Sequence, residues 1–333
     1  MKYAIMSDIH GNIDALQSVL DETKARNIDR YIFAGDYSFN LPYSNQTVDI
    51  IRTIPNAIVA KGNEEGYLDD YAKQNQSTWT DGQMQAHYWH YRNLTAANHK
   101  FLRGLPEIVT FNDNGTDITV THKSSDLYGT VEYMDFSSRK VSEKYQDNFD
   151  GRERILRDMQ EFVCTNKDFH TAIKPLTGGI YIFGHSHIQW YARHEDKVFI
   201  NPGSCGIPLD GAPGTPYSIL EIEGGQIRIT EHRAQYDTDK LIENMKKSEL
   251  YKAAPVWSEI MLWQLVTRFE LAWPFLEFVK KYADDTNDSV RPYSKTTWTK
   301  AFQLWIKQKS DPVAYCNFNS KCKSPKGNDY NSL

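Results

Sequence analysis

Short apolar segments alternate with amphipathic ones along the first sixty residues. Residues 2–6, 30–34 and 57–60 are compact apolar runs, which predict buried β-strands. Between them, apolar side chains recur at helical spacing over residues 13–26 and 48–54. Strands and helices that alternate with tight connections predict a parallel βαβ core with right-handed crossovers.

The middle of the chain is interrupted by two longer stretches without a strand pattern. Residues 66–104 and 123–177 are predicted to be largely helical insertions, and the second contains a clear helix over residues 152–163. Further strands are predicted around these insertions, at residues 108–111, 117–122, 179–183, 197–200, 217–221 and 226–231. The fold class indicated by this order of elements is α/β.

After about residue 237 the chain becomes helical and rich in Trp, Phe and Leu. Five of the eight Trp residues follow position 250. One stripe of apolar side chains has helical spacing and comprises Trp257, Ile260, Met261, Leu265, Phe269, Trp273 and Leu276. We expect a helical extension over residues 237–310, an apolar face that serves as core or as a homo-oligomer interface, and a polar tail over residues 311–333.

Composition excludes several classes of protein. Apolar residues make up 40% of the 333 positions and charged residues 24%, so neither a disordered nor a fibrous chain is indicated. The net charge of −5 argues against a nucleic-acid partner. The apolar run at the N-terminus is broken by Asp8, and residues 256–279 carry several charged side chains. Together with four scattered cysteines, this favours a cytoplasmic protein without a membrane partner.

Five polar clusters follow predicted strands. They are Asp8-Ile9-His10, Gly35-Asp36, Gly62-Asn63-Glu64, Thr121-His122 and Gly184-His185-Ser186-His187. Loops beyond the carboxyl ends of parallel strands converge on one crevice, so we expect these side chains to meet. Carboxylate, imidazole and amide ligands together suit Mn, Fe, Zn or Co better than Mg or Ca. A carboxylate can bridge two ions about 3.5–4 Å apart, and two divalent ions would leave positive charge for a phosphate group.

This ordered set of motifs resembles the calcineurin-like binuclear metallophosphoesterases. The short elements His10-Gly11-Asn12 and Asn201-Pro202-Gly203-Ser204 are similar to the small bacterial and archaeal phosphodiesterase branch of that superfamily. The resemblance implies a four-layer α/β/β/α sandwich, with residues 1–236 as the catalytic domain and residues 237–310 as a C-terminal helical extension. In length and extension the chain most resembles streptococcal-type enzymes that split dinucleoside polyphosphates, such as diadenosine tetraphosphate, asymmetrically.

The resemblance also implies roles for individual residues. The first metal ion would be held by Asp8, His10, Asp36 and His187, and the second by Asp36, Asn63, His122 and His185. Asp36 would bridge the ions, and Asp36, Asn63 and His10 would be the catalytic residues. Asn12 and Glu64 would contact the substrate. The cofactor is expected to be two divalent ions, with Mn favoured and Fe, Zn, Ni and Co as alternatives.

The activity implied is hydrolysis of phosphodiester or phosphoanhydride bonds in a phosphorylated small molecule such as a nucleotide, by attack of a metal-bridging hydroxide. Many members of the superfamily have His where this chain has Glu64, and that His assists the leaving group. Its replacement predicts a preference for good leaving groups. The alternatives are a metal-free protein-binding scaffold on the same fold and a phosphodiesterase for cyclic nucleotides or generic diesters.

Aromatic residues follow the Asn63 loop, and two interpretations of them stay open. Tyr67, Tyr71, Trp79, Tyr88, Trp89 and Tyr91 could form a stacking wall for a nucleobase, but plain helix packing is favoured. His87 and His90 lie three residues apart in a predicted helix, without a carboxylate partner at suitable spacing. A surface or packing role is favoured for both histidines.

Overall fold

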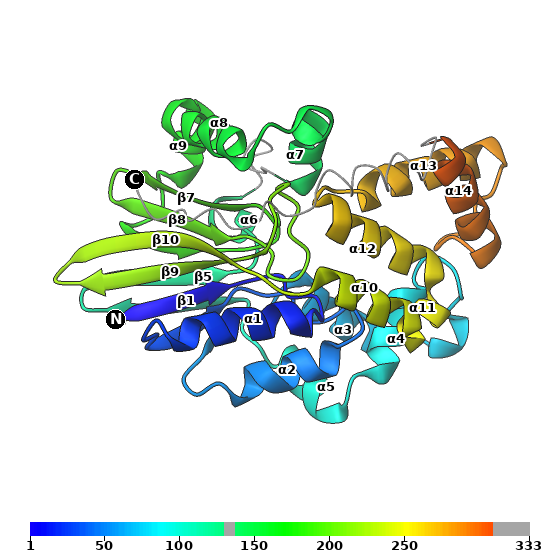
Figure 1. Cartoon of the computed structure of the whole chain (residues 1–333), viewed down its shortest axis with the longest axis horizontal. Helices are drawn as coiled ribbons and strands as arrows, with labels where there is room; N and C mark the ends of the chain where they lie inside the picture. The colour runs from blue at the N-terminus through cyan, green and yellow to red at the C-terminus, as the bar shows by residue number, and fades with distance from the viewer. Residues whose placement is uncertain (130–136, 309–333) are drawn as a thin grey trace.

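Two five-stranded sheets form the centre of the molecule. The computed structural model describes residues 1–129 and 137–308 (Figure 1). The first sheet has the order β10–β9–β1–β2–β3, with β1 at Lys2–Met6, β2 at Arg30–Phe33, β3 at Ile58–Val59, β9 at Thr215–Glu223 and β10 at Gln226–Ala234. The second has the order β4–β5–β6–β8–β7, with β4 at Ile108–Asp113, β5 at Thr116–Thr121, β6 at Gly179–Ile182, β7 at Gln189–His194 and β8 at Lys197–Pro202.

Each sheet is mixed, with a parallel part that matters for the site. In the first sheet β1, β2 and β3 run parallel, while β9 and β10 are antiparallel additions at one edge. In the second sheet β5, β6 and β8 run parallel, and β4 and β7 pair antiparallel with them. The carboxyl ends of the parallel strands are therefore the natural place for a crevice.

The space between the sheets is filled by β-branched and other apolar side chains. Ile5 and Ile32 from the first sheet meet Val120, Ile182 and Ile200 from the second, and all five are fully buried. Burying each such side chain contributes roughly 1.5–3 kcal/mol relative to leaving it exposed. The short apolar runs of the sequence thus become strands because both of their faces are covered.

Helices cover the two outer faces (Figure 1). The first sheet packs with α1 (Ile13–Lys24), α2 (Ser44–Thr53), α3 (Asn63–Lys73), α4 (Gln85–Asn93) and α5 (Ala96–Arg103). On the side of the second sheet lie α6 (Ser125–Tyr128), α7 (Ser138–Tyr145), α8 (Arg152–Thr165) and α9 (Lys167–Ile173). The four-layer α/β/β/α sandwich implied by the motifs is therefore confirmed.

The elements differ from the sequence-based expectation in several places. Strand β7 was not predicted, although its side chains alternate between buried and exposed positions. The 123–177 insertion holds α6, α7 and α9 besides the predicted helix. Helix α3 begins at Asn63 instead of residue 66, with Gly62 as its N-cap, so Asn63 and Glu64 belong to a helix N-terminus. The predicted polar tail, residues 311–333, lies outside the described residues.

The C-terminal extension packs on the sandwich as a group of helices. It consists of α10 (Thr238–Lys247), α11 (Glu249–Ala253), α12 (Pro255–Thr267), α13 (Ala272–Asp285) and α14 (Lys295–Gln308). In Figure 1 it lies beside the ends of the strands, and α11 contacts α4. Most of the apolar stripe is buried inside the chain, including Ile260, Met261 and Leu265, while Trp273 is 51% exposed. Because most of the stripe is already covered within the chain, little of it is left for a subunit interface. The homo-oligomer stays a prediction.

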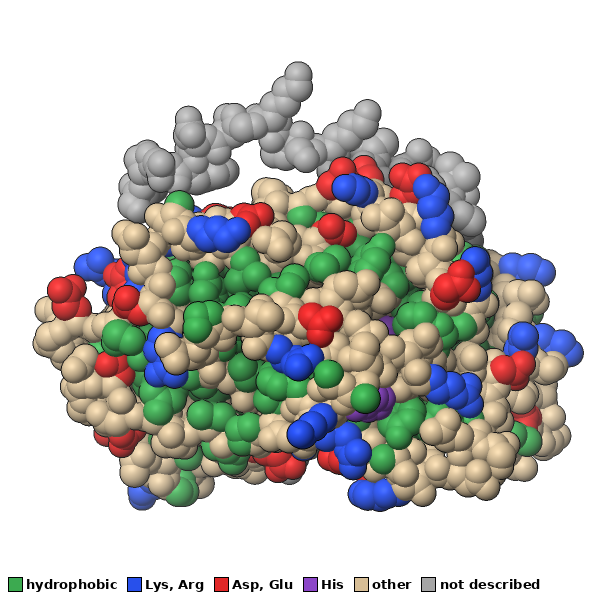
Figure 2. Space-filling model, turned by 90° about the horizontal axis from the view of Figure 1, so that it is seen from below, with side chains coloured by type: hydrophobic (Ala, Val, Ile, Leu, Met, Phe, Trp, Pro, Cys, Tyr) green, Lys and Arg blue, Asp and Glu red, His purple; other side chains and the backbone are tan. Residues whose placement is uncertain are grey.

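None of the helices in residues 1–129 and 137–308 is long and apolar enough to cross a membrane. Basic and acidic side chains are interspersed over the face of the molecule drawn in Figure 2, which is the face seen from below in Figure 1.

Phe275 of α13 offers a test of how the extension is held together. Its side chain is fully buried, and its ring centroid lies 4.8 Å from that of Trp298 and 5.2 Å from that of Trp305. Phe275→Ala should lower the free energy of unfolding by about 3–5 kcal/mol, because it removes these contacts and leaves a cavity. Leu304→Ala is the control, since Leu304 of α14 is 41% exposed and should change little. Equal denaturant midpoints for the two variants would contradict this packing.

Candidate metal centre

The predicted ligands sit at the ends of parallel strands from both sheets. Asp8 and Asp36 follow β1 and β2, and Asn63 follows β3 at the first position of α3. His122 comes directly after β5, and the loop after β6 carries His185 and His187. The structure therefore brings residues of five separate segments to one edge, where the two sheets meet.

The backbone at these positions is held in an unusual conformation. Five of the predicted ligands have positive φ angles, namely Asp8 (52°), His10 (51°), Asp36 (56°), His185 (68°) and His187 (60°). Residues other than glycine rarely adopt this left-handed region, and such strain gathers at functional sites. Backbone hydrogen bonds hold the loops in place, such as those from the Asp8 N–H to the Gly35 carbonyl (2.9 Å) and from the Ile9 N–H to the Asp36 carbonyl (2.7 Å).

Two glycines allow these loops to approach one another. A Cβ on Gly62 would collide with the carboxylate and backbone nitrogen of Asp36. A Cβ on Gly184 would collide with the side chains of Ser7 and Asp8. Glycine is therefore required at these two positions by the close packing of the ligand loops themselves.

Both aspartates lie between the imidazoles. Oδ1 of Asp8 is 3.3 Å from Nε2 of His187 and 3.9 Å from Nε2 of both His10 and His122. Oδ2 of Asp36 is 3.2 Å from Nε2 of His122 and 4.0 Å from Nε2 of His10. The sequence assigned the bridging position to Asp36, whereas in this arrangement Asp8 is equally central.

Carbonyl groups behind the ring set the orientation of two histidines. Nδ1 of His122 donates to the Ala34 carbonyl at 2.7 Å, and Nδ1 of His187 donates to the Ile207 carbonyl at 2.7 Å. A carbonyl can only accept, so Nδ1 keeps its proton, and Nε2 faces the aspartates, where it can bind a metal ion once any proton on it is released.

The donor atoms that remain free fit a metal ion. Oδ1 of Asn63 is buried without a hydrogen-bond partner among the described residues, and the buried Nε2 of His122 lies beside the carboxylate of Asp36, at 3.2 Å. Buried polar atoms without partners are uncommon in folded proteins and call for an explanation, for which a metal ion suffices. Ligand atoms lie within 4.8 Å of one another in three groups: Asp8 with His10 and His187, Asp8 with Asp36 and His122, and His10 with Asp36 and Glu64.

The electrostatics of the centre favour added positive charge. Burial would lower the pKa of His122, but the carboxylates of Asp36 and Asp8 outweigh it and raise the pKa to about 10. Burial also opposes the ionisation of Asp8, yet His187 and His122 hold its pKa below the usual range. By contrast, burial lowers the pKa of His10 to about 4, which leaves a neutral imidazole, the form that binds metals.

Three predicted site residues have surroundings that the sequence did not show. The side chain of His185 is exposed and lines the adjoining cavity, while its backbone N–H donates to Asp8. Glu64 is 8% exposed, and burial with the neighbouring Asp36 charge raises its pKa well above the usual range. Asn12 is fully buried; its side chain caps α1 at Ala15 and donates to the Gly206 carbonyl. These contacts fix the Asn12 side chain beside the start of α1, and its contact with a phosphate stays a prediction.

Glu65 supports the centre and was not identified from the sequence. Its Oε2 accepts hydrogen bonds from the backbone N–H groups of Asp36 (2.9 Å) and Gly62 (3.0 Å), and its Oε1 accepts one from the Tyr37 N–H (3.0 Å). This fully buried carboxylate therefore ties the Asp36 loop to the start of α3. Its position three residues after the helix-capping Gly62 is the one signal that could have indicated it.

Asn40 is a second residue that sequence reasoning missed. Its amide nitrogen lies 3.0 Å from Nδ1 of His10, and its Oδ1 accepts a 2.9 Å hydrogen bond from the indole N–H of Trp257 in α12. The C-terminal extension is thus connected to a predicted metal ligand through one side chain. No motif or spacing marks Asn40 in the sequence.

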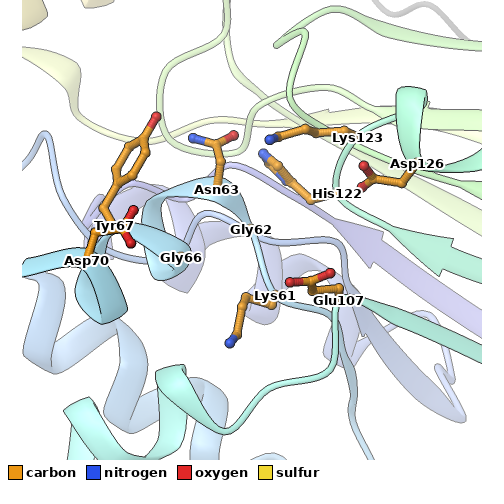
Figure 3. Close-up of a pocket in the computed structure, with 10 residues that line it drawn as sticks. All are labelled: Lys61, Gly62, Asn63, Gly66, Tyr67, Asp70, Glu107, His122, Lys123 and Asp126. Atoms are coloured by element: carbon orange, nitrogen blue, oxygen red, sulfur yellow. The ribbon is translucent and has the colours of Figure 1, made fainter. Parts of the chain in front are cut away.

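Two cavities adjoin the centre. One, of about 320 Å³, lies between the predicted ligands and the helices α12 and α13. The other, of about 310 Å³, is drawn in Figure 3, where His122 and Lys123 point toward the side on which Asn63 lies. Asn63 and Tyr67 line both cavities, so the two spaces flank the same centre.

Some of the aromatic residues after the Asn63 loop pack helices together, and others line the two cavities. Trp79 stacks on Tyr88 with ring centroids 4.2 Å apart, and Tyr71 and Tyr91 contact the same group edge-on, which is helix packing as favoured from the sequence. Tyr67 instead lines both cavities. His87, expected on a surface or in packing, lines the cavity next to α12.

Two stacked sheets with carboxylates and imidazoles gathered at the ends of their parallel strands define an α/β protein of the metallophosphoesterase class. The domain model of the calcineurin-like phosphoesterase superfamily matches residues 1–225. The chain therefore belongs to this superfamily, as its motifs predicted.

Similar proteins are found in archaea and bacteria. The uncharacterized protein MJ0912 of Methanocaldococcus jannaschii is 26% identical over an alignment of 269 positions, and the match covers 76% of this chain and 94% of that protein. The structure of a metallophosphoesterase from Sphaerobacter thermophilus has a TM-score of 0.56 at 21% identity and covers 80% of this chain and 100% of its own. The hypothetical protein PH1004 from Pyrococcus horikoshii has a TM-score of 0.53 at 17% identity, covering 78% of this chain and 97% of its own. These structural likenesses concern the fold.

Glu65→Gln tests whether the buried carboxylate holds the ligand loops. The amide NH₂ of Gln must face at least one of the N–H donors that Glu65 now accepts from, so we expect a loss of about 1–3 kcal/mol in unfolding free energy and a lower metal content. Glu223→Gln, at an exposed position in β9, is the control. Chemical denaturation and elemental analysis measure the two effects, and a variant as stable and as metal-rich as the control would refute the assigned role.

Proposed function

We propose that this protein is a phosphoesterase that hydrolyses phosphodiester or phosphoanhydride bonds with the help of two divalent metal ions. The observation that carries the proposal is the arrangement of Asp8 and Asp36 among three imidazole Nε2 atoms at distances of 3.2–4.0 Å. The predicted ligand sets, Asp8, His10, Asp36 and His187 for one ion and Asp36, Asn63, His122 and His185 for the other, are retained as part of the proposal.

The metal ions, when bound, would supply a nucleophilic hydroxide and neutralise the phosphoryl oxygens. The chain's own residues prepare the site for this chemistry. The Ala34 and Ile207 carbonyls keep the protons of His122 and His187 on Nδ1. Burial of Asp8 and Asp36, 0% and 3% exposed, shields their charges from solvent screening, so that each attracts cations more strongly than at a surface. The chemistry of these donors fits Mn, Fe, Zn or Co, and Mn is retained as the favoured metal in this proposal.

The substrate class is a phosphorylated small molecule, with nucleotides such as dinucleoside polyphosphates as the leading candidates. Two cavities that flank one centre suit a phosphorus atom bearing a group on each side, as in a diester or an anhydride. Their volumes of about 310 and 320 Å³ lie at the small end of the range for ligand sites, which fits small molecules better than a polymer.

Asp36→Asn and His122→Ala should abolish hydrolysis of bis(p-nitrophenyl) phosphate in the presence of Mn. Each removes a predicted ligand, and the loss should exceed the roughly 10–100-fold effect typical of residues that only support ligands. Circular dichroism should show that both variants stay folded. Asp168→Asn, at an exposed position in α9, is the control and should keep full activity.

The same measurements separate the enzyme from the scaffold alternative. Elemental analysis of purified protein should find bound transition metal, and the amount should fall in His122→Ala. Substantial turnover by either ligand variant with added Mn would refute the assignment, whereas wild-type protein without metal and without activity would favour the scaffold.

A series of phosphodiesters with graded leaving groups tests the role of Glu64. Because Glu64 stands in place of the histidine that assists departure in many relatives, the rate should fall steeply as the leaving-group pKa rises from aryl oxides to alkoxides. The measurement is kcat across the series at fixed pH with Mn present. A rate independent of leaving-group pKa would contradict the prediction and would indicate that Glu64 or another group donates the proton. Loss of that independence in Glu64→Gln would then assign the role to Glu64.

A further inference from the structure

The cavity next to α12 is built by the C-terminal extension as much as by the catalytic fold. Helices α12 and α13 contribute Trp257, Met261 and Trp273 to its wall, and the sandwich contributes Tyr67 and His87 opposite the predicted metal ligands. The rings form a chain of contacts: Tyr67 stacks with His87 at a centroid distance of 5.9 Å, and His87 meets Trp257 edge-on at 6.4 Å. This wall offers flat, polarisable surface directly beside the centre.

Trp273 stands out in this wall because it is 51% exposed. It lies in the first turn of α13, where its backbone N–H donates to Oε1 of Glu270. This hydrogen bond holds the backbone of Trp273 in place without using the indole ring. A large aromatic side chain held on a rigid element at the edge of a cavity, with half of its surface free, is suited to cover a bound ring.

Away from the predicted metal ligands, this cavity offers no positive charge to an anionic group. No Lys or Arg lines it within residues 1–129 and 137–308, while the carboxyl group of Glu270 does. The cavity on the other side of the centre is lined by Lys61 and Lys123, and Figure 3 shows the Lys123 side chain extending beside His122. Lys61 is partly engaged, because its Nζ donates to the Arg103 carbonyl at 2.8 Å. Among the described residues that line the two cavities, lysines lie on the Lys123 side alone, so anionic groups beyond the reacting phosphate are better accommodated there.

We propose that the α12–α13 cavity is a subsite for an uncharged planar ring system, such as a nucleobase or an aryl ester group, attached to the phosphate that reacts at the metal centre, and that Trp273 is its specificity-determining wall. The inference rests on the proposed function, since it takes the metal centre as the site of the phosphate. It adds the orientation of the substrate: the ring lies toward the extension, and further phosphate or sugar oxygens lie toward Lys123.

Two probes that differ only in the base test the subsite. AMP and ribose 5-phosphate carry the same phosphate, and their dissociation constants are measured by calorimetry on full-length, Mn-loaded protein, with phosphate release checked in the same samples. Stacking of one base on an aromatic side chain should make AMP bind about tenfold more tightly than ribose 5-phosphate. Trp273→Ala should reduce that ratio to about threefold or less and leave the binding of ribose 5-phosphate unchanged.

Two further variants complete the design. Trp273→Phe keeps a flat ring and should retain most of the preference for AMP, and Leu304→Ala, exposed on α14 of the same extension, should retain all of it. Equal binding of the two probes by the wild type, no binding of either, or an equal loss for both probes in Trp273→Ala would overturn the subsite.

The outcome is distinguishable from a failure of the proposed function. Turnover of bis(p-nitrophenyl) phosphate without any preference for AMP would overturn the subsite and leave the hydrolytic function standing. A preference for AMP that depends on Trp273, in a protein that hydrolyses no phosphoester, would support the subsite and overturn the hydrolytic function.

Discussion

The structure depends on two aspartates that are buried where the two sheets meet. A carboxylate removed from water is costly unless positive charge or hydrogen bonds compensate it. Asp8 and Asp36 belong to the first sheet, whereas His122 and His187, which approach them to within 3.2–3.3 Å, belong to the second. The attraction that would hold a metal ion is therefore also an attraction across the interface between the sheets, and binding a cation there should stabilise the sandwich as a whole.

The need to surround the two buried carboxylates with imidazoles explains the backbone conformation around the site. To bring five strand ends to one point, the chain accepts left-handed backbone at five ligands and glycine at Gly62 and Gly184. Each such residue lowers stability unless its neighbours compensate. Glu65 provides part of that compensation by accepting three backbone N–H groups, two of them from residues that adjoin ligands. The strained backbone and the hydrogen bonds that compensate for it thus lie within the same few loops.

The gathering of the proposed metal ligands could be predicted because each follows a strand, and the ends of parallel strands converge. The four layers were implied by the family resemblance, and the helical extension was indicated by the apolar periodicity after residue 237. Sequence reasoning failed where a role depends on a contact distant in sequence. Asn40 accepts a hydrogen bond from the indole N–H of Trp257, which lies 217 positions further along the chain, so no local pattern could reveal that contact. The contacts of Asn12 with Gly206 and Tyr236 span similar distances in sequence and could not be predicted either. Strand β7 was missed for a related reason, since its pairing partner β8 supplies the buried face that its own short sequence only suggests.

The contact between Trp257 and Asn40 shows that the C-terminal extension packs directly against the predicted metal centre. An appended domain would meet the catalytic fold at a separate surface, but α12 places an indole N–H on the side chain that lies 3.0 Å from Nδ1 of His10. The same helix and α13 form one wall of a cavity at the metal centre. The sandwich supplies the predicted ligands and the extension supplies much of the apolar wall beside them, so under the proposed function the sandwich would carry out the chemistry and the extension would contribute to the choice of substrate.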